Sequence, residues 1–235
     1  MFEELGVEHL QMIIKGGWVT IEICVIAVLV GVGSGFLVGL MGSGKYAVLR
    51  WATNLYVGVI RGIPILLLIF FSYFGVPLLL PGGDVPEFVA AIIALSLFAS
   101  AYIGEIVRGS INAIPTGQVQ AAEALGMRYW TYQFSVILPQ AIRLMVPPGV
   151  GFLVVLIKDS SLVAVIGLMD LTRAGKITAS LTARPISAYL IVGALYFVIC
   201  YFVSEFGKRY ERRLRNQSSV STSKKAMPAM GFKND

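Results

Sequence analysis

Few residues of this sequence are suited to covalent chemistry. The single histidine, His9, lies in an amphipathic stretch near the N-terminus, and the two cysteines, Cys24 and Cys200, fall inside apolar runs. The sequence contains no Ser-His-Asp set and no zinc-ligand spacing, so a hydroxyl or thiol would lack the neighbouring base that activates a nucleophile. The sequence therefore predicts no catalytic residue and no metal site. We interpret the cysteines as core or lipid-facing residues.

A near match to a phosphate-binding loop occurs in GLMGSGKY, residues 39–46. The loop pattern G-x-x-x-x-G-K-[ST] needs a small hydroxyl residue to hold magnesium, and it joins a strand to a helix. Here Tyr46 stands in the hydroxyl position, and the segment follows an apolar helical run. We therefore expect no nucleotide at this segment, and Gly42 and Gly44 more simply end a helix.

Charged side chains interrupt the apolar runs at two places, Arg61 and the segment 158–161, which reads KDSS. Charges at membrane depth are costly, so they are usually paired or functional. Together these side chains offer cationic, anionic and hydroxyl groups to a polar solute. The alternative is that they pair with one another, or with Glu105 and Arg108, and only hold helices together. Glu105 and Arg108 themselves are expected to be structural.

The composition places the chain in a membrane. Of its 235 residues, 57% are hydrophobic and 14% are charged, and the mean hydropathy is +0.79, whereas about 25% of residues in soluble proteins are charged. This length suits one compact domain. The net charge of +6 lies in a few clusters, which indicate membrane orientation rather than nucleic-acid binding.

Apolar runs long enough to cross a membrane, about 20 residues each, predict an all-α integral membrane protein with five spans. Pro64 lies early in the second span, and Pro147-Pro148 opens the fourth, which resumes beyond Ser161. A helix broken at these prolines would free backbone groups, which is tolerated only inside protein or beside a wet cavity. The predicted spans are 16–44, 62–83, 88–104, 144–157 and 185–204.

Lysine and arginine near the span ends predict the orientation. Lys45 and Arg50 follow the first span, five basic residues lie within 208–215, and the loop after the second span carries only acids. The N-terminus is therefore expected outside and the C-terminus in the cytoplasm. One region disagrees with this orientation, because the loop expected outside at 170–184 carries three basic residues: Arg173, Lys176 and Arg184.

The resulting organisation has three parts. Residues 1–15 form an extracytoplasmic segment, and residues 16–207 form the membrane domain, which includes a cytoplasmic segment at about 109–143. Residues 208–235 are predicted to be a basic, disordered tail, because the stretch from Asn216 onward is rich in serine and lysine.

Gly31, Gly35 and Gly39 repeat every four residues in the first span. Glycines on one helix face let a second helix approach closely, which is a common packing device in membranes. We expect the second helix to belong to the same chain. An interface with another subunit is the alternative.

A short, weakly polar stretch, VQAAEALGM at 119–127, lies inside the predicted cytoplasmic segment. A helix that starts after Pro115-Thr116 would present several alanines on its surface. Gly126 would supply a turn that needs a left-handed backbone or that has no room for a side chain. A solvated helix would carry more charge, so we predict a helix that presses against a partner protein.

This stretch resembles the cytoplasmic signature of permease subunits in binding-protein-dependent ABC importers, written E-A-A, three residues, G, then I-x-L-P. The sequence has Gln120-Ala121-Ala122, Gly126 and Ile137-Leu138-Pro139 at these places. Gln120 departs from the acidic first position, although Glu123 lies one turn further on. The resemblance extends from Gly16 to about Arg215. Five further segments resemble the polar amino-acid subgroup of this family: RGIP at 61–64, AYIGEIVRGSI at 101–111, GQ at 117–118, LPQAIR at 138–143 and KDSSL at 158–162.

The resemblance implies a five-span permease of type I ABC importer architecture in the bacterial inner membrane. It implies two cytoplasmic ATPase subunits that carry ATP and magnesium, a second permease copy or paralogue, an extracytoplasmic amino-acid-binding protein and an amino-acid substrate. The chain itself would be no enzyme and would hold no cofactor. Residues expected to couple to the ATPases are Gly117, Gln118, Gln120, Ala121, Ala122, Glu123, Gly126, Leu138 and Pro139, and those expected along the substrate path are Arg61, Gly62, Pro64, Lys158, Asp159, Ser160 and Ser161.

Two departures from the family pattern concern the substrate. Leu68 stands where relatives often have glutamine, and Gly151-Phe152 stands where many have Asn-Glu. Phe152 supplies no counter-charge for a buried cation. We therefore expect the substrate to be an acidic or neutral polar amino acid, with an acidic one favoured.

Two other classes of protein are weighed against the permease. A stand-alone channel or ion-coupled carrier would show internal inverted repeats and several acids at mid-membrane, and neither is evident in the sequence. A scaffold or sensor would need no coupling helix. Copurification separates these classes, because only the permease should bring down an ATPase subunit.

Overall fold

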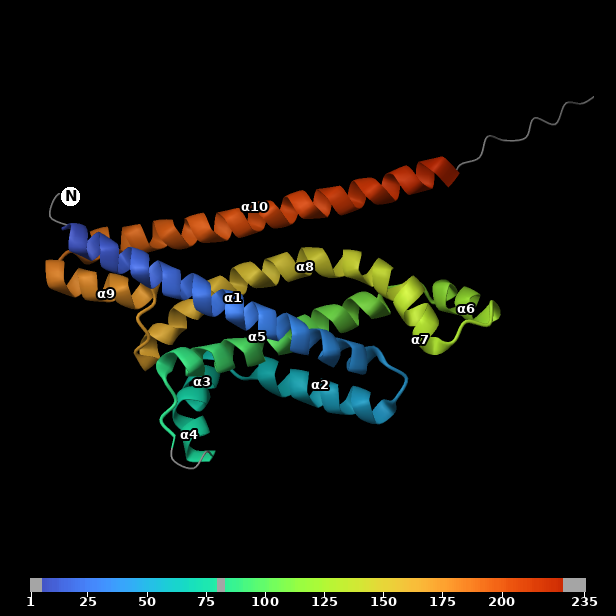
Figure 1. Cartoon of the computed structure of the whole chain (residues 1–235), viewed down its shortest axis with the longest axis horizontal. Helices are drawn as coiled ribbons and strands as arrows, with labels where there is room; N and C mark the ends of the chain where they lie inside the picture. Colours follow the sequence, from blue (N-terminus) through green and yellow to red (C-terminus); the bar gives the residue numbers. More distant parts are fainter. Residues whose placement is uncertain (1–5, 80–82, 226–235) are drawn as a thin grey trace, which may run out of the picture.

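The computed structural model describes residues 6–79 and 83–225, with side chains as far as residue 212. Every regular element in these residues is helical (Figure 1). Two of them, η1 and η2, are π-helical turns, and η3 is a 3-10 helix. In chain order the elements are α1 (Val7–Ser43), α2 (Ala47–Gly62), α3 (Ile65–Phe70), η1 (Phe71–Gly75), α4 (Val76–Leu79), α5 (Glu87–Asn112), α6 (Thr116–Ala124), α7 (Tyr129–Tyr132), η2 (Gln133–Ile137), α8 (Leu138–Asp159), η3 (Ser160–Ile166), α9 (Leu171–Thr182) and α10 (Pro185–Lys225).

Four helical segments of the described chain are long and apolar enough to cross a membrane. A fifth span is reached when α2 and the segment Ile65–Leu79, which meet at an angle of 99°, are counted together. The prediction of an all-α protein with five spans is confirmed in this form. The four uninterrupted segments are Val7–Ser43, Glu87–Asn112, Tyr129–Ile166 and Pro185–Arg212.

The second span differs from the continuous run predicted at 62–83. α2 ends at Gly62, Ile63 has an extended backbone (φ −92°, ψ 130°), and Pro64 (φ −55°, ψ 135°) precedes α3. Proline has no N–H, and it disfavours helical backbone in the residue before it. The sequence RGIP therefore bends the chain by 99°, at the break predicted for Pro64.

Three other boundaries differ from the sequence predictions. Pro147 and Pro148 lie inside α8 and do not open it, so the fourth span starts earlier, at Tyr129. α1 already begins at Val7 and extends the first span by about two and a half turns. The region 170–184, predicted as a loop, contains α9, whose buried residues recur at helical spacing.

The C-terminal region also differs from the prediction of disorder from residue 208. α10 continues without a break to Lys225, so the structure and the prediction differ as far as this residue. Extending a helix that a membrane span has already nucleated costs much less than starting one in isolation, and composition alone does not take this into account. Residues 226–235 lie outside the described part of the chain.

Each π-helical turn ends two residues before a proline: η1 precedes Pro77 and η2 precedes Pro139. A proline ring clashes with the carbonyl four residues earlier in a regular α-helix, and a wider turn relieves this contact. At η2 the side-chain amide of Gln140 donates to the Val136 carbonyl at 2.8 Å. The sequence LPQ therefore holds a local irregularity between α7 and α8.

The glycines of α1 pack against α5 of the same chain. A Cβ at Gly35 would lie 2.7 Å from the carbonyl oxygen of Ser100, and one at Gly31 would overlap the side chain of Ala99. These distances show that the two backbones approach more closely than side chains would permit. The geometry agrees with the expectation of packing within one chain.

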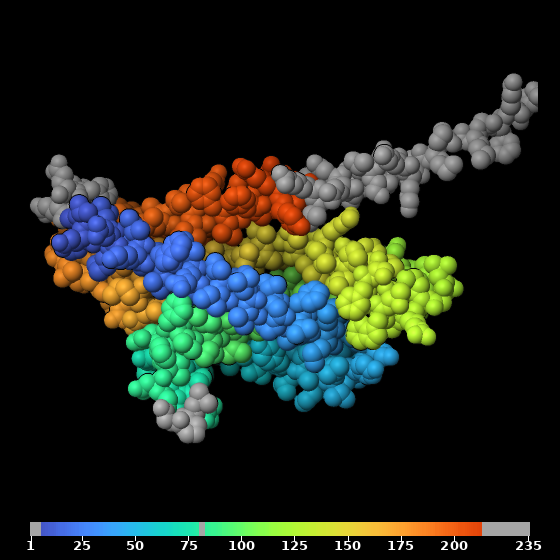
Figure 2. Space-filling model, viewed as in Figure 1, coloured from blue at the N-terminus to red at the C-terminus, as the bar shows by residue number. Residues whose placement is uncertain are grey.

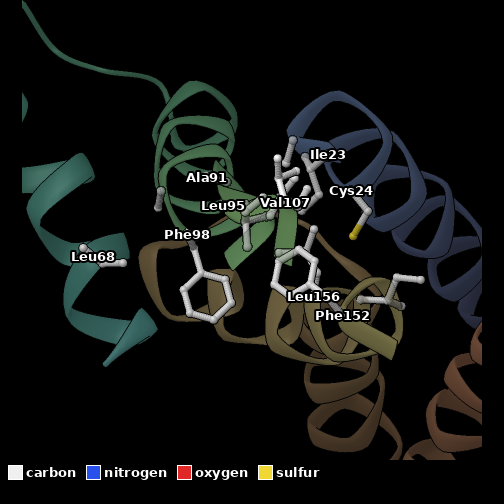
Figure 3. Packing of buried hydrophobic residues seen from close by; sticks show 14 of the residues in the cluster. Ile23, Cys24, Leu68, Ala91, Leu95, Phe98, Val107, Phe152 and Leu156 are labelled. Carbon is white, nitrogen blue, oxygen red and sulfur yellow. The ribbon is translucent and has the colours of Figure 1, made fainter. Parts of the chain in front are cut away.

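The main core lies where α1, α5 and α8 meet (Figure 3). Ile23, Leu95 and Leu156 come from these three helices and are fully buried, and Phe98 is nearly so. Burial of such side chains contributes about 1.5–3 kcal/mol each in water, but between membrane helices close packing replaces much of this driving force. The small residues of α1 therefore matter to stability.

Gly39→Leu is expected to destabilise the subunit, whereas Gly33→Leu on the same helix is not. A Cβ at Gly39 would lie 2.7 Å from the Gly104 carbonyl oxygen, but a Cβ at Gly33 would meet nothing within 4 Å. Overpacking a tight contact costs about 1–3 kcal/mol. Thermal unfolding of the two purified variants in detergent measures the difference in Tm, and equal Tm values would contradict the α1–α5 packing.

The two ends of the molecule carry different elements. α6 and α7 lie at one end of the long axis, whereas α9, α4 and the start of α5 lie at the other (Figures 1 and 2). The helices that are long and apolar enough to cross a membrane connect these ends. The two groups of short elements therefore lie at opposite ends of these helices.

Candidate functional site

α6 is closed at its C-terminal end by Gly126. Gly126 has φ +72°, a left-handed backbone that glycine, and less readily asparagine, adopts. The Gly126 N–H donates to the Glu123 carbonyl at 2.9 Å, and the Met127 N–H donates to the Ala122 carbonyl at 3.1 Å. These two bonds form a Schellman motif. A Cβ at Gly126 would meet nothing within 4 Å, so the backbone angle, and not space within the chain, requires glycine.

Most of α6 is exposed. Its buried residue is Ala122, 3% exposed, which belongs to the cluster that also contains Ile114 and Tyr132. Leu125, just beyond the helix, is a large apolar side chain that is 81% exposed. α6 is thus anchored through Ala122 and the half-buried Val119, and the rest of its surface is exposed. The exposed residues predicted to couple are Gly117, Gln118, Gln120, Ala121, Glu123 and Gly126.

Side chains connect α6 and α7 to the spans. The Tyr132 hydroxyl donates to the Glu123 carboxylate at 3.4 Å, which links α7 to α6. The Lys45 Nζ lies 5.1 Å from the ring centroid of Tyr46 and 5.8 Å from that of Tyr129, within the range of cation–π contacts. The lysine of the phosphate-loop-like segment therefore contacts aromatic rings. A displacement of α6 would reach α8 through Tyr132 and α1 through Lys45.

The I-x-L-P part of the signature lies at the junction of η2 and α8. Leu138 is buried in the subunit, whereas Pro139 is exposed. Leu138 therefore anchors the start of α8, and Pro139 sets the widened turn before it. This junction therefore sets the direction of α7 relative to the long helix α8.

Arg61 is held by an aromatic ring. Its guanidinium carbon lies 4.9 Å from the ring centroid of Tyr102, a cation–π distance. The Tyr102 ring stacks on Phe152, with centroids 5.2 Å apart and planes at 16°, and the centroid of Phe98 lies 4.5 Å from that of Tyr102. Within the described residues no carboxylate oxygen lies within 4.0 Å of Arg61. The N–H donors of Arg61 are therefore open to a bound anion.

The other charges near the path fall into two groups. Arg108 donates to Glu105 through two bonds of 2.6 and 3.0 Å, which agrees with the structural role expected for this pair. Lys158 and Asp159, at the end of α8, form no ion pair with the described part of the chain. Mutual pairing therefore does not explain the charges of Arg61, Lys158 and Asp159.

None of these three charged residues is fully buried. Arg61 and Lys158 are exposed, and Asp159 is half-buried, although all three belong to membrane-crossing segments. A charged side chain that faces lipid is costly, so such residues usually face a wet cavity or another protein. Of the remaining predicted path residues, Gly62 and Pro64 are exposed and Ser161 is half-buried.

Ser160 departs from its predicted place on the path. Its side chain is fully buried, and its hydroxyl donates to the Ile157 carbonyl at 2.8 Å. Ser160 therefore has no exposed surface that a solute could contact, and its hydroxyl proton is already donated. Leu68, at the position where relatives often have glutamine, is also buried in the main core.

A buried polar network at the α9 end was not predicted. Asp170 is fully buried, and its carboxylate caps α9 by accepting the N–H groups of Arg173 at 2.8 Å and Thr172 at 3.1 Å. Burial raises the pKa of Asp170, and these two bonds oppose the rise. Tyr196 on α10 lies 3.5 Å away, and the Thr20 hydroxyl on α1 accepts the first N–H of α9 at 3.0 Å. The network fixes α9 against α1 and α10.

Sequence reasoning missed three of these residues, Tyr102, Tyr132 and Asp170. Asp170 directly precedes a helical pattern, which is the ordinary signal of an N-cap, so it could have been found. The contacts of Tyr102 with Arg61 join residues far apart in the chain. No local pattern predicts such a contact.

Long apolar helices, a short exposed helix at one end and unpaired charges within the membrane-crossing segments are the features expected of a membrane transport subunit. Residues 31–216 match the family described as binding-protein-dependent transport system inner membrane component. The chain belongs to this family, and within it to the amino-acid ABC transporter permeases. It is therefore a multi-pass protein of a bacterial inner membrane and is not itself an enzyme.

Two relatives and one solved structure align with most of the chain. The chain is 35% identical to the arginine transport system permease protein ArtQ of Bacillus subtilis, over 89% of this chain and 95% of ArtQ. It is 34% identical to the glutamate/aspartate import permease protein GltK of Escherichia coli, over 88% and 95%. A crystal structure of an amino acid ABC transporter with histidines aligns with a TM-score of 0.81 and 35% identity, covering 88% of this chain and 96% of the solved one.

Proposed function

We propose that α6 couples this permease to cytoplasmic ATPase subunits, and that the face carrying Arg61 conducts an acidic or neutral polar amino acid. Two ATPase subunits would receive the exposed surface of α6, and they would bind the ATP and magnesium. Movement of α6 would shift α8 and α1 between two arrangements of the spans, as a rigid-body transition requires. The open surface of α6 and its contacts through Tyr132 and Lys45 support this role.

The charges at the two ends support a cytoplasmic position for α6. Lys45 and Arg50 follow α1 at this end, and the basic residues from Lys208 onward lie on the part of α10 that points the same way (Figure 1). The opposite end carries Asp84 and Glu87, and Arg173 and Lys176 of α9 are the exception there. Positive charge favours the cytoplasmic side, so the N-terminus would lie outside. A second permease, either a copy or a paralogue, would cover the charged face of the spans.

The observation that carries the substrate proposal is the unpaired guanidinium of Arg61. An amino-acid substrate brings at least one carboxylate, and a bidentate contact with Arg61 would bind it. Lys158 adds a second cation, Asp159 could accept from the substrate ammonium group, and Ser161 could add a hydroxyl contact. The aromatic surface of Phe152, stacked on Tyr102, gives no counter-charge to a cationic side chain. Glutamate therefore fits this face better than arginine.

Competition for labelled glutamate tests the substrate class. Unlabelled glutamate, aspartate and glutamine are expected to displace it from the purified permease–ATPase complex, whereas arginine and lysine are not. The complex is used without a binding protein, because a binding protein would impose its own selectivity on uptake. Displacement by arginine alone would overturn the substrate proposal, and a permease that purifies without an ATPase would overturn the coupling proposal.

A further inference from the structure

The helix α10 continues beyond the part that fits inside a membrane. Residues 185–204 carry no charge, and at 1.5 Å per residue they cover about 30 Å, the thickness of the hydrocarbon layer. The same unbroken helix then carries Glu205, Lys208, Arg209 and Arg212. The headgroup layer adds roughly 5–8 Å on each side of the hydrocarbon. Lys208 and Arg209, about 6–8 Å beyond the uncharged run, therefore lie at headgroup depth.

One side of this turn of α10 is held against α8. A Cβ at Gly207 would overlap the side chain of Val150 on α8, and Val203, one turn earlier, packs against the main core. The rotation of α10 is therefore fixed here, and side chains about half a turn away point outward. The exposed cations on that outer side, which we call the basic face of α10, are Lys208, Arg209 and Arg212.

Aromatic rings precede the basic face by one to two turns. Tyr201 and Phe202 are 55% and 57% exposed, and their ring centroids lie 6.1 Å apart with planes at 72°. Together with Phe206, Glu205 and Arg209 they line a small cavity of about 120 Å³. Tyrosine is enriched at the boundary between hydrocarbon and headgroups. The aromatic rings therefore place this part of α10 at the same boundary as the length of the uncharged run.

The cations of the basic face find few partners within the chain. The Arg209 Nε lies 3.1 Å from a carboxylate oxygen of Glu205, and the Arg209 side chain remains 69% exposed. A surface ion pair of this kind contributes little to stability, and the guanidinium has two further nitrogens that can bind a phosphate. Lys208 and Arg212 form no ion pair with the side chains that the structure describes. The basic face is therefore open to an anion.

We propose that the basic face of α10 binds the phosphate headgroups of anionic phospholipids, such as phosphatidylglycerol. Each lysine or arginine near an anionic membrane surface strengthens binding by about fivefold, and a guanidinium can donate two parallel bonds to a phosphate. The depth of the cations and the aromatic rings before them favour a lipid over a soluble partner protein. The inference goes beyond the proposed function and does not depend on it, because both surfaces of a bilayer present headgroups.

Quenching of a tryptophan by brominated lipid measures which lipid lies beside α10. The full-length permease carries Phe206→Trp as the reporter, and its native tryptophans, Trp18, Trp51 and Trp130, are replaced by phenylalanine. Brominated phosphatidylglycerol is compared with brominated phosphatidylcholine in bilayers, which gives their relative binding constant at the reporter. We expect a preference of about fivefold or more for phosphatidylglycerol at low salt, and a smaller preference at high salt.

Two triple variants locate the origin of this preference. Lys208→Gln, Arg209→Gln and Arg212→Gln together are expected to abolish it, while quenching by phosphatidylcholine stays unchanged because α10 keeps its position. The matched control removes three cations at the opposite end of the helices and should retain the preference. It combines Lys15→Gln, Arg173→Gln and Lys176→Gln.

The outcomes separate a lipid site from a general effect of protein charge. A preference that disappears in the α10 variant and persists in the control supports the proposal. Equal binding of the two lipids before the cations are changed, an unchanged preference in the α10 variant, or an equal loss in the control overturns it. Absence of quenching by either lipid also overturns it, because protein then covers this face. If the α10 variant loses quenching by phosphatidylcholine, Lys208→Gln alone decides: a reduced preference supports the proposal, and an unchanged one overturns it.

Discussion

Gly126→Val is expected to reduce uptake about tenfold or more without lowering the amount of permease in the membrane. A left-handed backbone costs an L-residue roughly 1–2 kcal/mol, about a factor of 5 to 30 in an equilibrium constant. The valine would release the N–H bonds of Gly126 and Met127 to α6, and α6 would no longer end in a fixed direction. Gly126 lies outside the membrane-crossing segments, so insertion is unaffected. Uptake and ATP hydrolysis by reconstituted complexes measure the coupling.

Gly126→Asn and Gly126→Ala identify the reason for the loss. Asparagine tolerates the left-handed backbone but carries a larger side chain, whereas alanine is small but strained. If the Schellman motif is what matters, Asn retains more activity than Ala. If the surface of Gly126 fits closely into an ATPase groove, Ala retains more than Asn. Full uptake by the valine variant, at a normal membrane level, would contradict the coupling role of this helix.

The local elements of the coupling region were predictable because glycine and proline act through their own backbones. Pro115 precedes α6, and Gly126 ends it with a positive φ, as the sequence predicts. Pro64 likewise bends the chain after Gly62. The same residue type gave a wrong prediction at Pro147-Pro148, where the chain stays helical. A proline removes one hydrogen bond, but packing of the neighbouring turns decides whether the helix continues.

Contacts between distant residues could not be predicted in this way. Gly31, Gly35 and Gly39 indicate that some helix approaches closely, and only the structure identifies α5 as that helix. The sequence also contains Arg61 as a charge whose aromatic support cannot be predicted, because Tyr102 contacts it from α5 and Phe152 of α8 stacks on Tyr102. A one-dimensional pattern reports that a residue needs a partner, and it does not report which one.

Arg61→Met is expected to weaken binding of glutamate to the permease–ATPase complex by about tenfold to hundredfold. Hydrogen bonds to charged groups contribute about 1.5–3 kcal/mol, and methionine keeps much of the volume of arginine while it removes every donor. Arg61→Lys is the matched variant that retains the charge without the planar fork, so an intermediate loss is expected. Equilibrium binding of labelled glutamate in detergent measures these dissociation constants, without a binding protein.

The Tyr102 variants show whether Arg61 acts as a ligand or only as a surface charge. Tyr102→Phe keeps the ring under the guanidinium, so glutamate binding should change little, whereas Tyr102→Leu removes the cation–π contact, worth about 0.5–2 kcal/mol, and should weaken binding severalfold. Loss of the ring frees the Arg61 side chain, and ordering it again on binding costs entropy. In Arg61→Met the Tyr102→Leu change should have no further effect on binding, because the cation is already gone. Additive losses in this double variant, or a normal dissociation constant for Arg61→Met alone, would mean that the guanidinium does not hold the substrate carboxylate.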